Sequence, residues 1–367
     1  MSKTGNRHFR GYLCSGLTFT ALSLAATGHQ AVAADMPEAL QAEGGSYLNN
    51  LASANSVFNH RLHDRLGEPG YAEALHNGDD NVSSLWMRHV GGHERSTLGD
   101  GQSFTRSNRY VIQIGGDLAQ WTRNNQDRWN LGVMAGYANV HSNTHSYHSE
   151  YNADGRVSGY SAGLYGTWFQ NGADNTGAYV DTWVLYNWFD NSVTSNHQQR
   201  EDYSSDGFTA SLEGGYTFKA GEFSGSLGTL NTWYIQPQLQ VTWMGVSDES
   251  CSRNDGTCFE SGGDDNIQTR LGVRTYLNSH HKMDDGKQRE FQPYLEVNWI
   301  HNTETYGVSN DGRSISRNDT ENLAEVRAGL EAKLNNNLSL WSNAGVQFTG
   351  PRKYSDLQGM LGVKASF

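Results

Sequence analysis

From about Leu85 to the terminal Phe367 the chain repeats one pattern, in which apolar and polar residues alternate over segments of about 12 to 15 residues. In the segment 232–246, for example, Trp233 and Trp243 share one face, and glutamines occupy positions on the other. Polar, Gly- or Asn-rich stretches separate the segments. A period of two over this length predicts β-strands rather than helices.

The alternation predicts twelve strands. Their approximate bounds are 85–95, 107–121, 128–141, 156–169, 177–190, 206–219, 232–246, 266–278, 289–302, 321–334, 338–349 and 356–367. Each strand is long enough to cross about 25 Å of hydrocarbon when tilted, and an even number suits a bacterial outer-membrane barrel. We therefore predict an all-β membrane protein, an antiparallel transmembrane β-barrel of about twelve strands over residues 85–367. The polar stretch from about 304 to 320 can form an additional small hairpin.

Composition narrows the class of protein. Mean hydropathy is −0.67, and no run of 18 apolar residues occurs after the N-terminal segment. This excludes a membrane-spanning helix in the rest of the chain. The net charge of −12 comes without a Lys/Arg cluster and argues against a nucleic-acid partner. A soluble β-sandwich is the alternative, but it would need shorter strands and a polar face in water all round.

Connection lengths and tryptophans predict how the barrel is oriented. Short breaks such as 122–127 alternate, unevenly, with longer ones such as 247–265. Short turns in the periplasm and long loops at the cell surface are typical of outer-membrane barrels. The tryptophans predicted at periplasmic strand ends are Trp121, Trp129, Trp168 and Trp233, and those at outer ends are Trp188, Trp243 and Trp299. These positions predict two aromatic girdles.

The N-terminal region predicts export. Three basic residues within the first ten, an apolar stretch from Leu13 to Ala26, and the small residues Ala31 and Ala33 are typical of a signal peptide over residues 1–33. An exported chain meets oxidising conditions, so we expect Cys251 and Cys258 to form a disulfide within one loop.

The segment Ser46–Leu66 does not alternate but carries apolar residues at three- and four-residue intervals, which predicts a helix over 46–67. Ser46 is the expected N-cap, and Gly67 followed by Pro69 the expected stop. Such a helix is about 31 Å long, close to the membrane thickness, yet its charged residues would be costly against lipid.

We therefore expect the helix to thread the barrel lumen; the alternative is a helix in the periplasm. The predicted partners in the lumen are Arg61, Asp64 and Arg65 on the helix and Glu213, Arg270, Arg274, Glu296, Glu325 and Arg327 on the strands.

Several long segments resemble the translocator domains of autotransporters, the type V secretion proteins, in the branch of the diffuse-adherence adhesin. The segments that carry the resemblance are RLHDRLGE (61–68), LWMRHVGGHERS (85–96), SNRYVIQIGGDLAQW (107–121), WYIQPQLQVTWMGV (233–246), SHHKMDDGK (279–287) and REFQPYLEVNWIHNT (289–303). The resemblance implies a monomeric twelve-stranded barrel with an internal helix, which carries an N-terminal passenger in cis to the cell surface.

The resemblance also implies partners and a C-terminal signal. The family ends in an aromatic residue read by the barrel-assembly machinery, and periplasmic chaperones are expected partners besides outer-membrane lipid. Here Leu361, Val363, Ala365 and Phe367 alternate up to the carboxyl terminus, as in an outward apolar edge strand. Family members carry passengers of hundreds of residues, whereas only 34–45 stands between signal and helix, so we expect a passenger remnant or linker there.

Other candidate chemistry is weaker. Asn49-Asn50 resembles a pair used for passenger self-cleavage inside the barrel, but its distance from the RLHDR segment favours helix-surface amides. His141, His145 and His148 are spaced for a metal without a fixed geometry, and we expect loop histidines and no metal or cofactor.

Two other functions are weighed against translocation. A porin or surface adhesion barrel is the first alternative, and a barrel hydrolase is less favoured, because no nucleophile motif stands beside His301. The sequence therefore predicts a transport barrel that is not an enzyme.

Overall fold

The chain is described by a computed structural model that covers residues 38–66, 84–99, 101, 103–124, 126–147, 150–172, 176–196, 198–225, 229–248, 259–280, 289–310, 312–335 and 337–367. The predicted signal peptide and the predicted disulfide between Cys251 and Cys258 lie outside the described residues.

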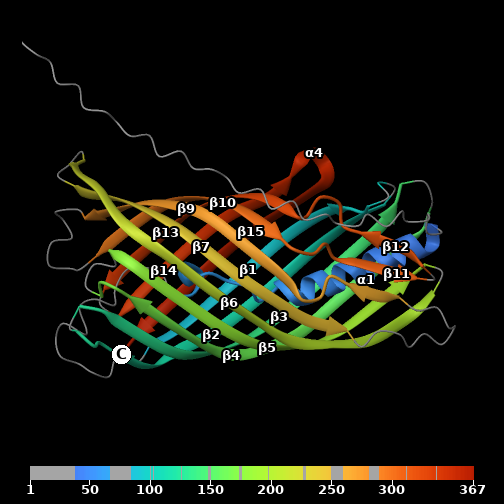
Figure 1. Ribbon diagram of the computed structural model, residues 1–367, viewed down its shortest axis with the longest axis horizontal. Coiled ribbons are helices and arrows are strands. Elements are labelled where there is room, and N and C mark those ends of the chain that lie inside the picture. The colour runs from blue at the N-terminus through green and yellow to red at the C-terminus, as the bar shows by residue number, and fades with distance from the viewer. Residues whose placement is uncertain are drawn as a thin grey trace, which may run out of the picture. The chain divides into compact units, whose positions relative to one another are not determined.

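The predicted fold class is confirmed, because twelve antiparallel strands close into a barrel (Figure 1). The barrel strands are β1 (Ser84–Thr97), β2 (Ser103–Trp121), β3 (Arg128–Ser146), β4 (Asn152–Phe169), β5 (Gly177–Ser195), β6 (Gln198–Ser224), β7 (Leu230–Asp248), β9 (Asn266–His280), β10 (Glu290–Asn302), β13 (Asn322–Asn335), β14 (Leu338–Thr349) and β15 (Tyr354–Ser366). Each strand pairs with its neighbours, and β1 pairs with both β2 and β15, which closes the ring.

Several strands are longer than the sequence predicts. β6 runs from Gln198 to Ser224, although alternation is clear only over 206–219, and β5 continues to Ser195. Beyond the hydrocarbon both faces of a strand meet polar surroundings, so the ladder continues where the apolar–polar period has faded.

The barrel places apolar side chains outside and polar side chains inside. Leu212 is 58% exposed on the outward face of β6, whereas its neighbour Glu213 is 2% exposed inside. This inverted distribution suits a strand that faces lipid on one side and a polar lumen on the other. None of the described helices is both long and apolar enough to cross a membrane.

Aromatic residues cluster near both ends of the barrel. Trp121, Trp129 and Trp168 follow one another around the end where β2 and β4 finish, with ring centroids 6.0 and 6.1 Å apart. Near the opposite end Tyr160 lies 6.2 Å from Trp188. We call this opposite end, which carries the longer connections, the outer end.

Two helices lie inside the barrel (Figure 1): α1 (Glu38–Ser56), in the outer half, and α2 (Leu62–Leu66). The prediction of one continuous helix over 46–67 is wrong in its start and in its continuity, although the helical region does end at Leu66. α1 begins eight residues before Ser46 (46 − 38), and Ser46 is no cap, because its Oγ donates to Ala153 O at 3.1 Å. Residues 57–61 are not helical.

A small sheet packs against α1 at the outer end. It consists of β8 (Glu260–Gly262), β11 (Gly307–Asn310) and β12 (Arg313–Ser316), and β11 and β12 form the hairpin predicted within 304–320. Its apolar residues join Tyr47, Leu48 and Leu51 of α1 in one buried cluster. Gly44 allows this contact, since a Cβ there would lie 3.2 Å from Ile315 Cγ2. The short helix α4 (Gly350–Lys353) joins β14 to β15.

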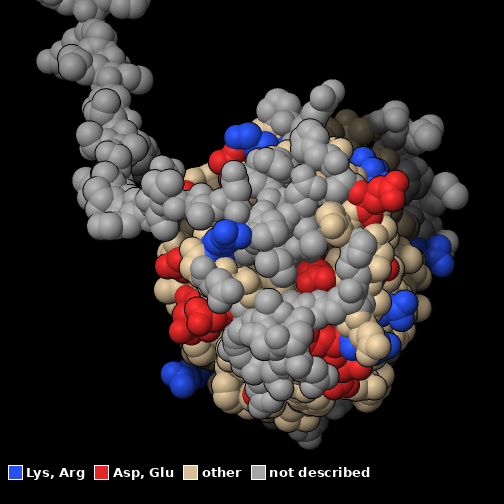
Figure 2. All heavy atoms as spheres, turned by 90° about the vertical axis from the view of Figure 1, so that its right-hand side faces the viewer, with Lys and Arg blue, Asp and Glu red and all other residues tan. Residues whose placement is uncertain are grey.

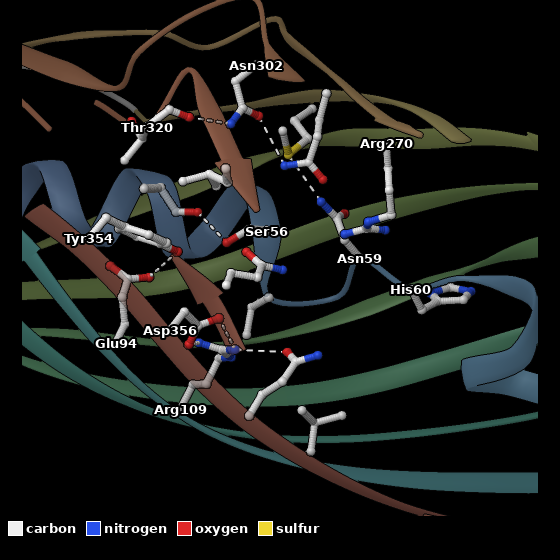
Figure 3. A pocket seen from close by; sticks show the side chains of 18 of the residues that line it. Ser56, Asn59, His60, Glu94, Arg109, Arg270, Asn302, Thr320, Tyr354 and Asp356 are labelled. Carbon is white, nitrogen blue, oxygen red and sulfur yellow. Dashed lines mark hydrogen bonds and ion pairs between the residues drawn. The ribbon is translucent and has the colours of Figure 1, made fainter. Parts of the chain in front are cut away.

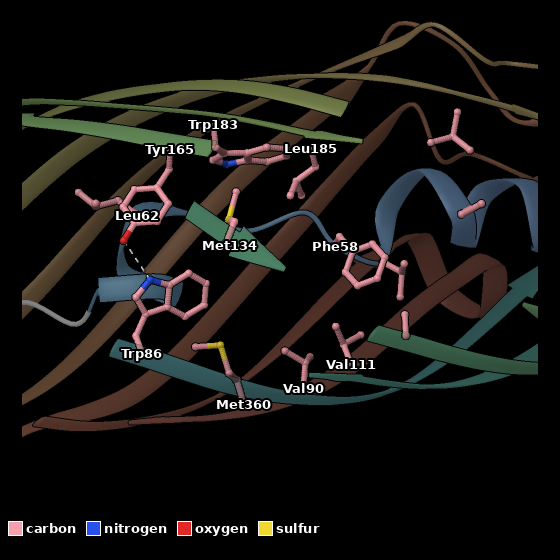
Figure 4. Packing of buried hydrophobic residues seen from close by; sticks show 14 of the residues in the cluster. Phe58, Leu62, Trp86, Val90, Val111, Met134, Tyr165, Trp183, Leu185 and Met360 are labelled. Atoms are coloured by element: carbon pink, nitrogen blue, oxygen red, sulfur yellow. Dashed lines mark hydrogen bonds between the residues drawn. The ribbon is translucent and has the colours of Figure 1, made fainter. Parts of the chain in front are cut away.

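A second buried cluster fills the lumen around residues 57–62 (Figure 4). Phe58 and Leu62 pack among wall residues that include Trp183 and Tyr165. Trp86 Nε1 donates to Tyr165 Oη at 3.2 Å, so even these aromatic side chains keep their polar groups bonded. The lumen is therefore occupied by the protein's own N-terminal segment.

Candidate functional site: the occupied lumen

The charged residues of the RLHDR segment meet opposite charges on the barrel wall. Arg61 Nη1 contacts Glu296 Oε1 and lies 3.3 Å from Glu325 Oε2. Asp64 Oδ1 lies 2.7 Å from Arg327 Nη1. All five side chains are at most 8% exposed, and charges so buried are stable only when they are paired.

Arg65 makes a separate set of contacts on the neighbouring wall. Its Nη2 lies 2.5 Å from Asp181 Oδ1 and donates to Thr167 Oγ1 at 3.0 Å. Its guanidinium also lies 3.9 Å from the centre of the Tyr165 ring. The side chain is fully buried, so its position specifies one register of the chain in the lumen.

The wall also binds the backbone where the helix is interrupted. Phe58 O and Asn59 O accept hydrogen bonds from Arg88 Nη2 at 3.5 and 3.4 Å. His60 O accepts from Gln240 Nε2 at 2.9 Å and from Trp183 Nε1 at 3.1 Å. These side chains replace the intrahelical partners that a continuous helix would supply, which explains why α1 stops at Ser56.

A new helical turn begins at the same place. Glu213 Oε2 accepts a hydrogen bond from Leu62 N at 3.0 Å, at the amino end of α2. A carboxylate suits a helix N-terminus because the unpaired N–H groups there carry partial positive charge. The Glu213 side chain therefore binds the backbone of α2 at Leu62 and not an arginine side chain.

The remaining predicted lumen residues lie on the wall. Arg270 donates to Gln240 Oε1 at 2.6 Å and lies 3.7 Å from Glu325 Oε2. Arg274 lies 2.6 Å from Glu331 Oε1. Both arginines thus lie against carboxylates of the barrel wall, Glu325 and Glu331.

Sequence reasoning missed several wall residues that hold the plug. They are Arg88, Asp181, Trp183, Gln240 and Trp341. Alternation carried part of the signal, because Arg88 and Asp181 occupy inward positions that each follow an apolar outward residue, Met87 and Val180. It could not show that Trp183 and Trp341 point inward, since both are apolar residues in strands with an apolar outer face.

A small cavity lies beside the plug (Figure 3). Its volume is about 130 Å³, and Arg109, Glu94 and Asp356 are among its lining residues. Arg109 is bidentate to Asp356, at 2.7 and 2.6 Å, so part of the lining is a closed ion pair.

The C-terminal residues lie where an outward face was predicted. Leu361 and Phe367 are 64% and 72% exposed, and Val363 and Ala365 are half-buried on the same face. The expectation of an edge strand is wrong for the closed barrel, because β15 pairs with β14 on one side and β1 on the other.

The other candidate groups form contacts with the protein itself. Asn49 Oδ1 accepts from Arg317 at 2.9 Å, and Asn50 Nδ2 donates to Tyr203 Oη at 3.0 Å. His141 lies on β3, and His148 falls outside the described residues. Within the ranges that the structure describes, no three His, Cys, Asp or Glu residues gather in a metal-binding arrangement.

A sequence model of the family "Autotransporter beta-domain" matches residues 85–345. The chain belongs to this family. It is 65% identical to the uncharacterized protein YdeU of Escherichia coli K12 over 90% of this chain and 71% of that protein. It is 36% identical to the autotransporter adhesin AIDA-I of E. coli over 89% of this chain, and spans about a quarter (25%) of the length of that adhesin.

Solved structures agree with this assignment. The transport unit of the autotransporter AIDA-I from E. coli matches with a TM-score of 0.79 at 34% identity, covering 89% of this chain and 99% of that one. The β domain of the Bordetella autotransporter BrkA matches with a TM-score of 0.56 at 19% identity, covering 78% and 100%, and shows the fold alone. The chain is thus an autotransporter translocator barrel, integral to the outer membrane.

Proposed function

We propose that the barrel exports the polypeptide that precedes α1 through its lumen to the cell surface, and then keeps residues 38–66 as a plug. The path of the chain carries this proposal. α1 packs on β8, β11 and β12 at the outer end, and α2 lies deeper in the lumen. β1 begins at Ser84, paired with Ser366 at the opposite end. A chain in this position has its amino-terminal side at the outer end.

The export experiment uses an epitope placed immediately before Glu38 in intact cells. We expect external protease to remove the epitope while the barrel stays inserted. The matched control is the same epitope after Arg123, in the turn between β2 and β3 at the other end, where it should stay protected. An epitope before Glu38 that stays protected in an inserted barrel would contradict the proposal.

We further propose that periplasmic chaperones deliver the chain to the barrel-assembly machinery, which inserts it as a monomeric barrel. β15 supports this, since its backbone edge that pairs with β1 is available to another strand only before β1 closes the ring. Deleting Phe367 should lower the inserted fraction, measured as the heat-shifted band of outer membranes, whereas Ser355→Ala on the same strand should not. Equal insertion would remove the role assigned to Phe367.

We also propose that the chain has no catalytic activity of its own, and that free diffusion through it is blocked. The buried plug and the small cavity favour a closed translocator over a porin. Single barrels in planar bilayers should therefore conduct poorly until residues 38–66 are deleted. Large, steady conductance of the intact chain would favour the porin instead.

A further inference from the structure

The outward face of β1–β4 carries a group of basic residues near the outer end. Arg95, Arg106 and Arg156 are exposed, and they lie on β1, β2 and β4. Their neighbours in each strand show that they point away from the lumen, because Ser96, Thr105 and Val157 are buried inside. The figure that views the outer end shows Lys, Arg, Asp and Glu side chains around its rim (Figure 2).

Two of the arginines lie closer to the outer end than an exposed tyrosine of the same strand, and Arg95 is level with Arg106. Arg106 stands four residues beyond Tyr110 on β2 (110 − 106), and Arg156 stands four residues beyond Tyr160 on β4 (160 − 156). Four residues of a tilted strand rise about 10 Å. Aromatic girdles mark the boundary between hydrocarbon and headgroups, so these guanidinium groups lie at headgroup depth.

Two of the cations oppose each other directly. Arg95 and Arg106 are register partners across β1 and β2. Like charges at such positions destabilise a sheet unless something compensates them. Arg95 Nε contacts His93 Nε2 at 3.1 Å, and the Arg106 guanidinium lies 5.0 Å from the Phe104 ring, so neither contact supplies negative charge.

Outward carboxylates such as Asp154 and Asp190 lie on the neighbouring strands, but among the described residues they are not paired with the three arginines. In the described part of the chain, no carboxylate pairs with Arg95, Arg106 or Arg156. The nearby outward Asp154 accepts a hydrogen bond from Asn143 at 2.8 Å and lies 3.9 Å from His141 Nε2. By contrast, Arg200 on β6 has its own carboxylate, Asp202, at 2.7 Å.

We propose that Arg95, Arg106 and Arg156 form a binding site for the phosphate groups of an outer-leaflet glycolipid. Guanidinium groups bind phosphate oxygens through paired N–H donors, and clustered arginines at headgroup depth are a known basis for recognising anionic lipid. The ligand compensates the Arg95–Arg106 pair and fixes the β1–β2 side of the barrel in the outer leaflet. The site uses the orientation proposed above, but its test does not require export.

The test measures lipid binding to the full-length purified barrel by native mass spectrometry, with lipid A and with dephosphorylated lipid A as probes. Removing each cation should weaken binding of lipid A about fivefold, so Arg95→Gln/Arg106→Gln should weaken it more than tenfold. Arg200→Gln, which changes an arginine already paired with Asp202, should bind like the wild type. Dephosphorylated lipid A should bind the wild type no better than lipid A binds the double variant.

Thermal unfolding gives a second readout that a structural role would not produce. In detergent without phosphorylated lipid, Arg95→Gln/Arg106→Gln should unfold at the same or a higher temperature than the wild type, because like-charge repulsion is relieved. With lipid A added, the order should reverse. Equal binding of dephosphorylated lipid, equal loss in Arg200→Gln, or displacement of lipid A by millimolar inorganic phosphate would overturn the proposal.

Discussion

At the scale of single residues, the lumen depends on buried charges that lie against opposite charges. Arg65 and Asp181 are the clearest pair, since both side chains are almost fully buried and their charged atoms lie 2.5 Å apart. Removing one partner of a buried pair leaves the other charge without compensation.

Arg65→Met should therefore destabilise the docked plug by about 3–5 kcal/mol. Asp181→Asn alone should do the same through Arg65, and the double variant should recover most of the loss. Denaturant unfolding of the three variants in lipid vesicles measures these differences. Additive losses in the double variant would show that the two residues do not act as a pair.

A second residue-scale prediction concerns the turn between β2 and β3. Burial would raise the pKa of the Asp127 carboxyl, but hydrogen bonds from Arg123 N, Trp129 Nε1, Asn124 N and Thr122 Oγ1 together lower it to about 2. Because this folded-state pKa lies below the ordinary value of 3.8, the stabilisation is complete above pH 3.8 and is lost as the pH falls through 2. Carboxyl NMR of Asp127 should titrate near pH 2, and Asp127→Asn should remove this part of the pH dependence. Titration at 3.8 or above would refute it.

At the scale of elements, α1 fits between the barrel wall and the small outer sheet because Gly44 and Gly45 carry no side chain. A Cβ at Gly45 would lie 2.6 Å from Thr144 Cγ2 and 2.7 Å from Leu98 Cδ1, closer than real Cβ contacts. The close packing of α1 against the wall therefore requires glycine at position 45.

Gly45→Val should loosen α1 from the wall at a cost of about 1–3 kcal/mol, as overpacking usually does. Conductance of single barrels in planar bilayers should rise as the plug becomes mobile. Gly91→Val is the matched control, because a Cβ there meets nothing within 4 Å and the residue lies on the outward face. Equal conductance of both variants would show that contact at Gly45 does not hold the helix.

The strands were predictable from the sequence and the helix boundaries were not. Alternation reports directly which face of a strand meets lipid, so each segment such as 232–246 corresponds to one barrel strand. The interruption at 57–61 depends on Arg88, Trp183 and Gln240, which lie far away in sequence. The periodic apolar residues of 46–66 continue across that interruption and gave no sign of it.

At the scale of the whole molecule, the barrel has its apolar side chains on the outside and its polar side chains inside, the reverse of a soluble protein. Lipid meets leucines, valines and aromatic residues, while the interior holds ion pairs and amides around residues 38–66. The general placement of Arg61, Asp64 and Arg65 in a polar lumen followed from the cost of charge in lipid. The particular wall residue that each of them contacts depends on how the strands close into the barrel, and the local sequence pattern does not predict this.

The central claim is that the N-terminal helix lies inside the barrel, and an engineered cross-link tests it most directly. Ser46 Oγ and Thr144 Oγ1 are 3.3 Å apart, so cysteines at both positions should form a disulfide in inserted barrels whose Cys251 and Cys258 are replaced by serine. The account predicts a reductant-sensitive cross-link for Ser46→Cys/Thr144→Cys and none for Ser46→Cys/Ser342→Cys, since Ser342 lies on the outward face of β14. A folded, inserted barrel without the first cross-link, or with both to the same extent, would contradict it.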